Sequence, residues 1–419
     1  MLEWFGEISL TESPAPYLIY IMLGGSMLIA TAGWAGQRKR TLKAAIMAVG
    51  AALTCWLILE VAWKPFPDRI PWQIYVAGAG ASFVLFSAFL QRGRRRLLAA
   101  LTVFAIAGAW GVFNLEFQEY PTVRSLAPRP VAAPMDYETL QSTYEAARQA
   151  PQLDGREVGA LVTVDLDATQ FTHRPAIAYL PPAYFTRPDL KLPVLVLMAG
   201  NPGKPQQWFD SGGAAITLDD YQATHGGISP IVVSVDGTGS MTANPICVDG
   251  PTEKVQTYLA VDVPAQLKEK FRVDPNQQRW TIGGLSYGGT CSLQIVTNAP
   301  DSYGTFLDFS GQREPTVGDH SKTVQQFFEG DEDAYQAVNP ERLLEDAAGT
   351  RKYAQLQGRF IAGAKDSHAR EDLSELNRKA QEAGMQSSYA EVQGGHSYQV
   401  WRVALRENLD YVAARGGLK

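Results

Sequence analysis

Four apolar runs within the first 117 residues restrict what this chain can fold into. They extend over residues 17–35, 44–63, 73–90 and 97–115. A helix needs about 20 mostly apolar residues to cross a hydrocarbon core roughly 30 Å thick, and each run comes close to that length. We therefore expect residues 1–117 to form a membrane domain with four transmembrane helices.

Basic residues are concentrated after the first and the third run. The segment QRKRTLK begins at residue 37 and the segment QRGRRR at residue 91, whereas the other flanks of the runs are acidic or nearly balanced. Cytoplasmic loops carry an excess of Lys and Arg. The pattern predicts a multi-pass protein of the cell membrane whose N-terminus and whose residues after 116 are extracytoplasmic. The first run is a full span without a basic segment before it, so we expect no cleavable signal peptide.

Charge separates the two parts of the chain. Residues 1–117 carry 10 Lys and Arg against 6 Asp and Glu, and the remainder carries 27 against 37. Because binding to phosphates needs a basic surface, the acidic remainder argues against nucleic acid as a partner.

The chain has three cysteines, and their positions differ in character. Cys55 lies inside the second apolar run. Cys247 and Cys291 lie in the part expected outside the cytoplasm, where oxidation is possible. We expect a Cys247–Cys291 disulfide, with two separate buried thiols as the alternative.

The sequence after the apolar runs divides into a linker and a larger domain. Residues 118–154 begin with the proline-rich QEYPTVRSLAPRPVAAPM, typical of a stiff spacer, and continue with a segment that has the spacing of a capping helix. Across residues 155–419 short apolar strands alternate with helical segments, which predicts an α/β fold with a mostly parallel sheet and helices on both faces.

The sequence GLSYG at residues 284–288 has the pattern of a nucleophile elbow. In that motif a strand turns sharply into a helix, and small neighbours allow the strained serine to project its hydroxyl group away from the sheet. An apolar strand precedes Ser286 and a helical segment follows it, which is the context that the motif requires. Ser286 is therefore the candidate nucleophile, and a glycine-rich turn is the alternative.

A serine nucleophile needs a base and an acid that orients the base. His396 follows the last expected strand in GGHSYQVW, and Asp366 ends the strand before it in GRFIAGAKDS. The order Ser, Asp, His is that of α/β-hydrolases. His368, two residues after Asp366, is the weaker alternative for the base.

An oxyanion hole requires two backbone N–H donors. One is expected from Tyr287, the residue after the nucleophile. The other is expected from the segment MAGNPGKPQQW, where Pro202 has no N–H group and the donor is therefore Asn201 or Gly200. The sequence has no cluster with the ligand spacing of a metal site, so we expect neither a metal nor a cofactor.

With these motifs, residues of roughly 155 to 415 resemble the putative-esterase family of α/β-hydrolases, which includes esterase D and the secreted mycolyltransferases of mycobacteria. The segments GGLSYGGTCSLQ, DFSG and GGHSYQVWR carry the resemblance. The membrane-anchored arrangement is similar to that of actinobacterial membrane esterases of this family. The resemblance implies an α/β-hydrolase fold and acyl-enzyme chemistry.

Two positions depart from the mycolyltransferase pattern. Ala199 stands where that group has an acidic residue that helps to bind trehalose, and Tyr398 replaces a tryptophan in the histidine segment. Both departures argue against transfer to trehalose.

These observations favour a membrane-anchored extracytoplasmic serine esterase that hydrolyses a lipid or cell-envelope ester. The first alternative is an acyltransferase that moves an acyl group to a sugar or lipid hydroxyl, and the second is a non-catalytic envelope receptor with a relic hydrolase domain. The sequence leaves open the acyl group, the alcohol, the oligomeric state and whether residues 321–347 form a substrate wall or only pack.

Overall fold

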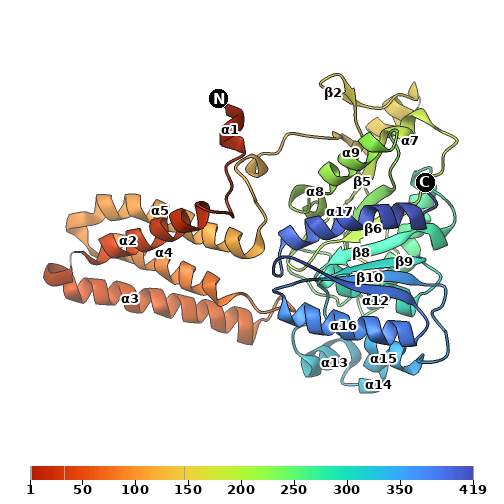
Figure 1. Ribbon diagram of the computed structural model, residues 1–419. Helices are drawn as coiled ribbons and strands as arrows, with labels where there is room; N and C mark the ends of the chain where they lie inside the picture. Colours follow the sequence, from red (N-terminus) through yellow and green to blue (C-terminus); the bar gives the residue numbers. More distant parts are fainter. Residues whose placement is uncertain (1, 33, 146, 419) are drawn as a thin grey trace. The chain divides into compact units, whose positions relative to one another are not determined.

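A computed structural model of the chain describes residues 2–32, 34–145 and 147–418. The chain divides into two compact units, residues 1–128 and residues 129–419. In Figure 1 the first unit is coloured red to orange and the second yellow to blue.

The first unit consists of helices. Its elements are α1 Leu2–Gly6, α2 Ala15–Thr31, α3 Trp34–Trp56, η1 Leu57–Ala62, α4 Trp72–Leu90, η2 Arg92–Arg94, α5 Arg95–Phe117 and η3 Arg124–Leu126. Among the described residues, three helical segments are long and apolar enough to cross a membrane: Gly36–Ala62, Trp72–Leu90 and Arg92–Phe117. The first expected span is present as α2, an apolar helix that is shorter, at 17 residues. The structure therefore supports three membrane-crossing helices rather than the expected four.

The surface of these helices is apolar where a water-soluble bundle would be polar. Leu28 is 72% exposed, Val103 67% and Ile46 64%. Helix α2 nevertheless packs closely on α5, because a Cβ atom added to Gly111 would lie 2.7 Å from Cγ1 of Ile19. The short helix is thus an integral part of this bundle.

The second unit is built on a sheet of nine strands in the order β1-β4-β5-β7-β6-β8-β9-β10-β11. Strand β5 pairs antiparallel with β4 and β7, and all other neighbours in the sheet are parallel. A separate hairpin joins β2 (Gln152–Leu153) to β3 (Arg156–Glu157). The strands of the large sheet are β1 Ala133–Asp136, β4 Ala160–Val164, β5 Ala176–Leu180, β6 Val194–Met198, β7 Ile231–Val235, β8 Thr281–Leu285, β9 Thr305–Phe309, β10 Gln357–Gly363 and β11 Gln386–Val392.

Helices cover both faces of this sheet (Figure 1). Alternate side chains of β6 point to opposite faces. Leu195 and Leu197 join a cluster with α8 (Gln207–Asp210), α9 and α17, whereas Val194 and Val196 join a cluster with α11, α12, α15 and α16. The longer helices are α9 Ala214–Thr224, α11 Val263–Lys270, α12 Tyr287–Asn298, α13 His320–Phe328, α15 Pro340–Asp346, α16 Ser367–Glu382 and α17 Tyr398–Arg415. The predicted α/β arrangement is confirmed.

Short helical elements complete the second unit. They are α6 Tyr137–Thr139, η4 Leu140–Glu145, α7 Pro182–Thr186, α8 Gln207–Asp210, α10 Val255–Thr257, η5 Tyr258–Asp262, η6 Gln277–Arg279 and α14 Glu332–Gln336. Residues 133–136, which lie inside the expected spacer, form the edge strand β1 and pair with β4. An edge position tolerates Pro134, because one side of an edge strand makes no ladder hydrogen bonds.

Candidate active site

Ser286 occupies the turn between strand β8 and helix α12. Its backbone has φ 53° and ψ −119°, and the residue is 5% exposed. A non-glycine residue with a positive φ costs of order 1–3 kcal/mol, and such strain clusters at active sites. The Ser286 N–H donates to the carbonyl oxygen of Phe309 at 2.7 Å, which ties the turn to the neighbouring strand. The geometry is that of the expected elbow.

The glycines around Ser286 are required by close contacts. A Cβ atom on Gly284 would overlap the backbone of Gly288, and a Cβ atom on Gly288 would lie 2.7 Å from the carbonyl oxygen of Ala199. A Cβ atom on Gly200 would lie 2.8 Å from Cδ1 of Leu285 and 3.5 Å from Cβ of Ser286. The loop after β6 therefore runs directly against the elbow, which is possible only without side chains at these positions.

Asp366 and His396 are hydrogen-bonded to each other. The distance from Nδ1 of His396 to Oδ2 of Asp366 is 2.7 Å. Burial favours the neutral form of Asp366, but the hydrogen bond and charge of His396 outweigh it, and the pKa of Asp366 lies below its ordinary value. The ring of Trp401 packs edge-on against the imidazole, with 5.1 Å between the ring centroids. The pair is thus held in one orientation.

The three candidate triad residues lie at one edge of the sheet. Ser286 follows β8, Asp366 follows β10, and His396 follows β11, and these strands are parallel. Backbone hydrogen bonds link the strand ends across the sheet, from Ser310 N–H to the Ile361 carbonyl at 2.8 Å and from Ala364 N–H to the Val392 carbonyl at 2.7 Å. The structure therefore brings the residues expected from the sequence to the same edge.

The other histidines have different surroundings. His368 is exposed on α16, and the imidazole that is hydrogen-bonded to Oδ2 of Asp366 is that of His396. The remaining three make contacts typical of structural roles: His173 stacks on Tyr258, His225 stacks on Tyr221, and His320 lies between Glu314 and Glu332.

The residues expected to form the oxyanion hole come from the elbow and from the loop after β6, which packs against it. In the described part of the chain, no other backbone group is hydrogen-bonded to the N–H of Asn201 or of Tyr287. The Asn201 side chain donates to the carbonyl oxygen of Ala243 at 2.8 Å, which holds the loop that carries this amide. A Cβ atom on Gly200 would lie 3.5 Å from Cβ of Ser286, and Tyr287 follows the serine in the chain, so Gly200 and Tyr287 both border it.

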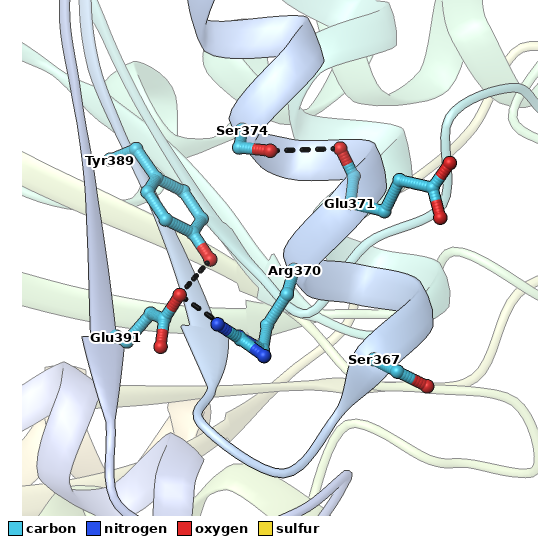
Figure 2. Close-up of a pocket in the computed structure, with 6 residues that line it drawn as sticks. All are labelled: Ser367, Arg370, Glu371, Ser374, Tyr389 and Glu391. Carbon is cyan, nitrogen blue, oxygen red and sulfur yellow. Dashed lines mark hydrogen bonds and ion pairs between the residues drawn. The ribbon is translucent and has the colours of Figure 1, made fainter.

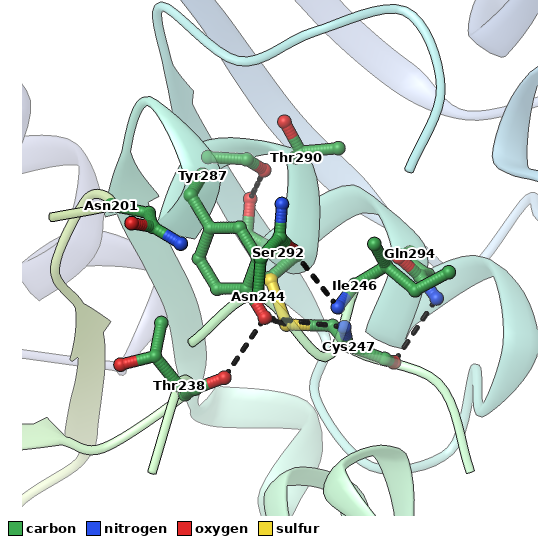
Figure 3. Close-up of a disulfide and its surroundings, with 12 residues drawn as sticks. Asn201, Thr238, Asn244, Ile246, Cys247, Tyr287, Thr290, Ser292 and Gln294 are labelled. Atoms are coloured by element: carbon green, nitrogen blue, oxygen red, sulfur yellow. Dashed lines mark hydrogen bonds between the residues drawn. A yellow bond between two sulfur atoms is a disulfide. The ribbon is translucent and has the colours of Figure 1, made fainter. Parts of the chain in front are cut away.

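Cys247 and Cys291 form a disulfide with a Cα–Cα distance of 5.6 Å. It joins the long loop after β7 to the second turn of α12, the helix that follows Ser286 in the chain (Figure 3). Cys55 is a free cysteine on α3.

The segment 321–347 lies in helices α13, α14 and α15 and the turns between them. Leu344 of α15 is fully buried in the hydrophobic core, and α15 packs on α12 and α16. Phe327 and Phe328 of α13 pack on a small cluster of Ile246, Val248 and Val317, next to the disulfide. These contacts give the segment a structural role around the loop that carries Cys247.

A polar cavity of about 300 Å³ opens between α16 and β11 (Figure 2). It is lined by Ser367, Arg370, Glu371, Ser374, Tyr389 and Glu391. None of the candidate site residues lines it, although Ser367 follows Asp366 directly. In residues 2–32, 34–145 and 147–418, no group of three or more His, Cys, Asp or Glu side chains is arranged to hold a metal ion.

Sequence reasoning missed the ion pair of Arg174 and Asp236 beside the loop that carries Asn201. Nη2 of Arg174 lies 2.7 Å from Oδ1 of Asp236, and this carboxylate is almost completely buried. One signal was present: Asp236 directly follows the apolar strand β7, at the edge where reactive groups of such sheets gather. Its partner precedes β5 and could not be assigned from sequence.

Comparisons with known proteins identify the family and the fold. Residues 171–412 match the model of a family described as "Putative esterase". The chain is 50% identical to an uncharacterized protein of Corynebacterium glutamicum over 430 residues, and the match covers 100% of both chains.

Two solved structures share the fold of the second unit. A ferulic acid esterase has a TM-score of 0.54 at 19% identity, over 62% of this chain and 98% of its own. An S-formylglutathione hydrolase from Agrobacterium tumefaciens has a TM-score of 0.50 at 18% identity, over 61% of this chain and 95% of its own. At these identities the likeness shows the fold, which is that of an α/β-hydrolase.

Proposed function

The chain belongs to the esterase family and is a carboxylic ester hydrolase, and we propose that it works as a membrane-anchored, extracytoplasmic serine esterase on a lipid or cell-envelope ester. The main support for serine catalysis is the hydrogen bond between Asp366 and His396, with 2.7 Å between Oδ2 and Nδ1, at the same sheet edge as the strained Ser286.

In the proposed reaction Ser286 Oγ attacks the ester carbonyl carbon and His396 Nε2 accepts the hydroxyl proton. The carboxylate of Asp366 accepts the hydrogen bond from Nδ1–H, which selects the tautomer with a basic Nε2 and stabilises the imidazolium. His396 then returns the proton to the leaving alcohol, and an acyl-enzyme remains. Water attacks this ester in the second half of the reaction and releases the acid.

Negative charge develops on the carbonyl oxygen in both halves. The N–H groups of Tyr287 and Asn201 would donate to this oxyanion, with the Gly200 amide as the alternative on the second side. Donors fixed before the reaction typically contribute about 3–4 kcal/mol each to the stability of the transition state. The Tyr287 amide also belongs to the first turn of α12, where the helix dipole favours negative charge.

The proposed location follows from the basic clusters. Arg38, Lys39, Arg40 and Lys43 begin the first long membrane helix, and Arg92, Arg94, Arg95 and Arg96 lie at the junction of the next two. Positive residues favour the cytoplasmic side, so three crossings from there place residues after 117 outside. This result does not depend on α2. A fourth crossing by the shorter α2 would place the N-terminus outside as well.

The proposed substrate follows from the anchor. A catalytic domain that is tethered to the outer face of a membrane meets lipids and envelope esters at high effective concentration. Lipid extracts of cells that carry the wild type or Ser286→Ala provide the test. Accumulation of an acylated envelope lipid in the Ser286→Ala strain is the expected result, and identical profiles would contradict a lipid substrate.

Two further measurements separate the alternatives. Labelling of the purified full-length protein with a fluorophosphonate probe reports whether Ser286 is nucleophilic, and failure to label the folded wild type would favour a relic domain. Product analysis with and without an added alcohol acceptor distinguishes hydrolysis from acyl transfer, because only transfer yields a new ester.

A further inference from the structure

One loop supports both sides of the proposed oxyanion hole. This loop, residues 236–247, follows β7 and ends at the disulfide. The Tyr287 hydroxyl donates to the Gly237 carbonyl at 2.9 Å, while the Asn201 side chain donates to the Ala243 carbonyl at 2.8 Å. Figure 3 shows the Tyr287 side chain beside the disulfide, with its hydroxyl oxygen 3.2 Å from Sγ of Cys247. The residues that would provide the two oxyanion amides thus rest on the 236–247 loop.

Arg174 connects this loop to the segment that carries Asn201. Its Nε lies 2.8 Å from Oδ2 of Asp236 and its Nη2 lies 2.7 Å from Oδ1, a two-pronged ion pair. Its Nη1 donates at 2.9 Å to the carbonyl oxygen of Gly203, two residues after Asn201. Gly203 N–H in turn donates to the Met241 carbonyl at 3.2 Å. A single guanidinium group therefore bridges the two loops.

Asp236 is the fixed point of this arrangement. Its side chain is 1% exposed, against 27% for Arg174. The carboxylate also accepts from the N–H groups of Thr238 at 3.0 Å and Gly239 at 3.1 Å. Burial opposes its ionisation, but the bonds from Arg174 and from these backbone groups outweigh burial, and the pKa of Asp236 lies below its ordinary value. The group is therefore a buried anion whose main counter-charge is Arg174.

We propose that Arg174 and Asp236 are positioning residues that hold the Gly200–Gly203 segment so that the Asn201 amide points at the developing oxyanion. The inference rests on the ester hydrolysis proposed above. Oxyanion donors act only when they lie about 2.7–3.1 Å from the charged oxygen. Neither residue touches the reacting atoms. They set the position of a donor, through the Gly203 carbonyl and through the 236–247 loop.

This role predicts an effect on the transition state rather than on binding of the ground state. A displaced donor lowers kcat, whereas KM changes little, because the neutral ester needs the donor less than the oxyanion does. A purely structural pair would instead lower the fraction of folded protein without changing kcat per folded site.

The chain offers a matched control for the test. Arg156 and Asp219 form a two-pronged ion pair of the same chemistry, at 3.0 and 2.8 Å, between β3 and α9. Arg156→Met removes a guanidinium from an Arg–Asp pair in the same unit without touching the proposed oxyanion loop.

The experiment uses the full-length protein in detergent with p-nitrophenyl butyrate as substrate. It measures kcat, KM, the thermal midpoint and fluorophosphonate labelling for the wild type, Arg174→Met, Arg174→Lys and Arg156→Met. We expect Arg174→Met to lower kcat by about 10- to 100-fold, less than the 10²–10³ for deletion of a donor, with KM within threefold. Arg174→Lys should lose less kcat than Arg174→Met, because lysine keeps the positive charge although it lacks the planar guanidinium. Arg156→Met should lower only the midpoint.

Added guanidinium provides a second readout. Millimolar guanidinium chloride should restore part of the kcat of Arg174→Met, and sodium chloride at the same concentration should not. If Arg174→Met fails to fold, kcat, KM and the thermal midpoint of Arg174→Lys are compared with those of the wild type and Arg156→Met. Wild-type kcat in folded Arg174→Lys and Arg174→Met, or a kcat loss equal to that of Arg156→Met, would overturn the inference. Absence of hydrolysis and of labelling in the wild type would instead overturn the proposed function.

Discussion

Oδ2 of Asp366 lies 2.7 Å from Nδ1 of His396, although 30 residues separate the two in the chain. The bond forms because β10 and β11 are parallel neighbours, so that the loops after them meet at one sheet edge. Lys365 N–H also donates to the Gly394 carbonyl at 2.8 Å, which closes the two loops on each other. The pair therefore has a fixed orientation before any substrate binds.

Replacing Asp366 by Asn should lower kcat by about 10⁴-fold, because an amide selects the wrong imidazole tautomer. The measurement is hydrolysis of p-nitrophenyl butyrate at pH 7–8, with folding checked by circular dichroism. His368→Gln is the control, since His368 is two residues away and exposed. A larger loss of kcat in His368→Gln than in Asp366→Asn would contradict the assignment of His396 as the base.

Replacing Ser286 should abolish activity, while the effect on stability should depend on the residue that replaces it. Ser286→Gly and Ser286→Ala should both lose hydrolysis and fluorophosphonate labelling. Only glycine relieves the strain of φ 53°, so Ser286→Gly should be more stable than Ser286→Ala by about 1 kcal/mol. Urea unfolding measures the difference, and equal stability of the two variants would show that the turn is not strained.

Gly288→Ala should destabilise the second unit by about 3 kcal/mol or more, since the added methyl group meets the carbonyl oxygen of Ala199 at 2.7 Å. Gly395→Ala is the matched control, because a Cβ atom there has nothing within 4 Å. The thermal midpoints of both variants provide the comparison. A normal midpoint for Gly288→Ala would mean that the elbow and the loop after β6 are not in close contact.

Loss of the disulfide should destabilise the folded state. The bond closes a loop of 44 residues, and the chain-entropy estimate for such a loop is about 4 kcal/mol as an upper value. We expect the double variant Cys247→Ala/Cys291→Ala to lose about 2–4 kcal/mol of unfolding free energy, and dithiothreitol to have the same effect on the wild type. Cys55→Ala should change neither value, and sensitivity of the double variant to dithiothreitol would contradict this account.

Asp308 should make stability depend on pH. It lies beneath the start of α12 and accepts from the Gly311 N–H at 2.8 Å; burial raises its pKa to about 8. An unfolded aspartate titrates near 3.9. The folded state therefore favours the neutral acid. The contribution of Asp308 to the free energy of unfolding is fully present below about pH 4 and is lost as the pH rises through 8.

Asp308→Asn removes this titration. At pH 4 the variant and the wild type should have the same free energy of unfolding. As the pH rises to 8, the variant should become more stable than the wild type by a few kcal/mol. The upper limit of this difference is about 5 kcal/mol, because each pKa unit corresponds to 1.36 kcal/mol. Urea unfolding at several pH values measures the difference. A constant difference between the two proteins across this range would show that Asp308 is ionised in the folded state.

The sequence by itself determined the parts of this protein that depend on local pattern. Apolar runs marked the membrane helices, alternation of strands and helices predicted the sheet, and glycine spacing identified the elbow at Ser286. Asp366 and His396 were found because parallel strands bring their carboxyl ends to one edge, so chain order was enough to place them. In each case the signal is a local pattern or the order of such patterns along the chain.

Only the tertiary structure decided which distant groups meet. The partner of Asp236 is Arg174, 62 residues earlier, and the spacer contributes strand β1 through pairing with β4. The structure likewise decided the length of α2. This helix has 17 residues and ends at Thr31, whereas the apolar run continues to residue 35. The physical reason is that charge pairing and edge pairing depend on separation in space. The pattern of residues along the chain indicates whether a segment forms a helix or a strand, but it does not indicate which other segments lie beside it.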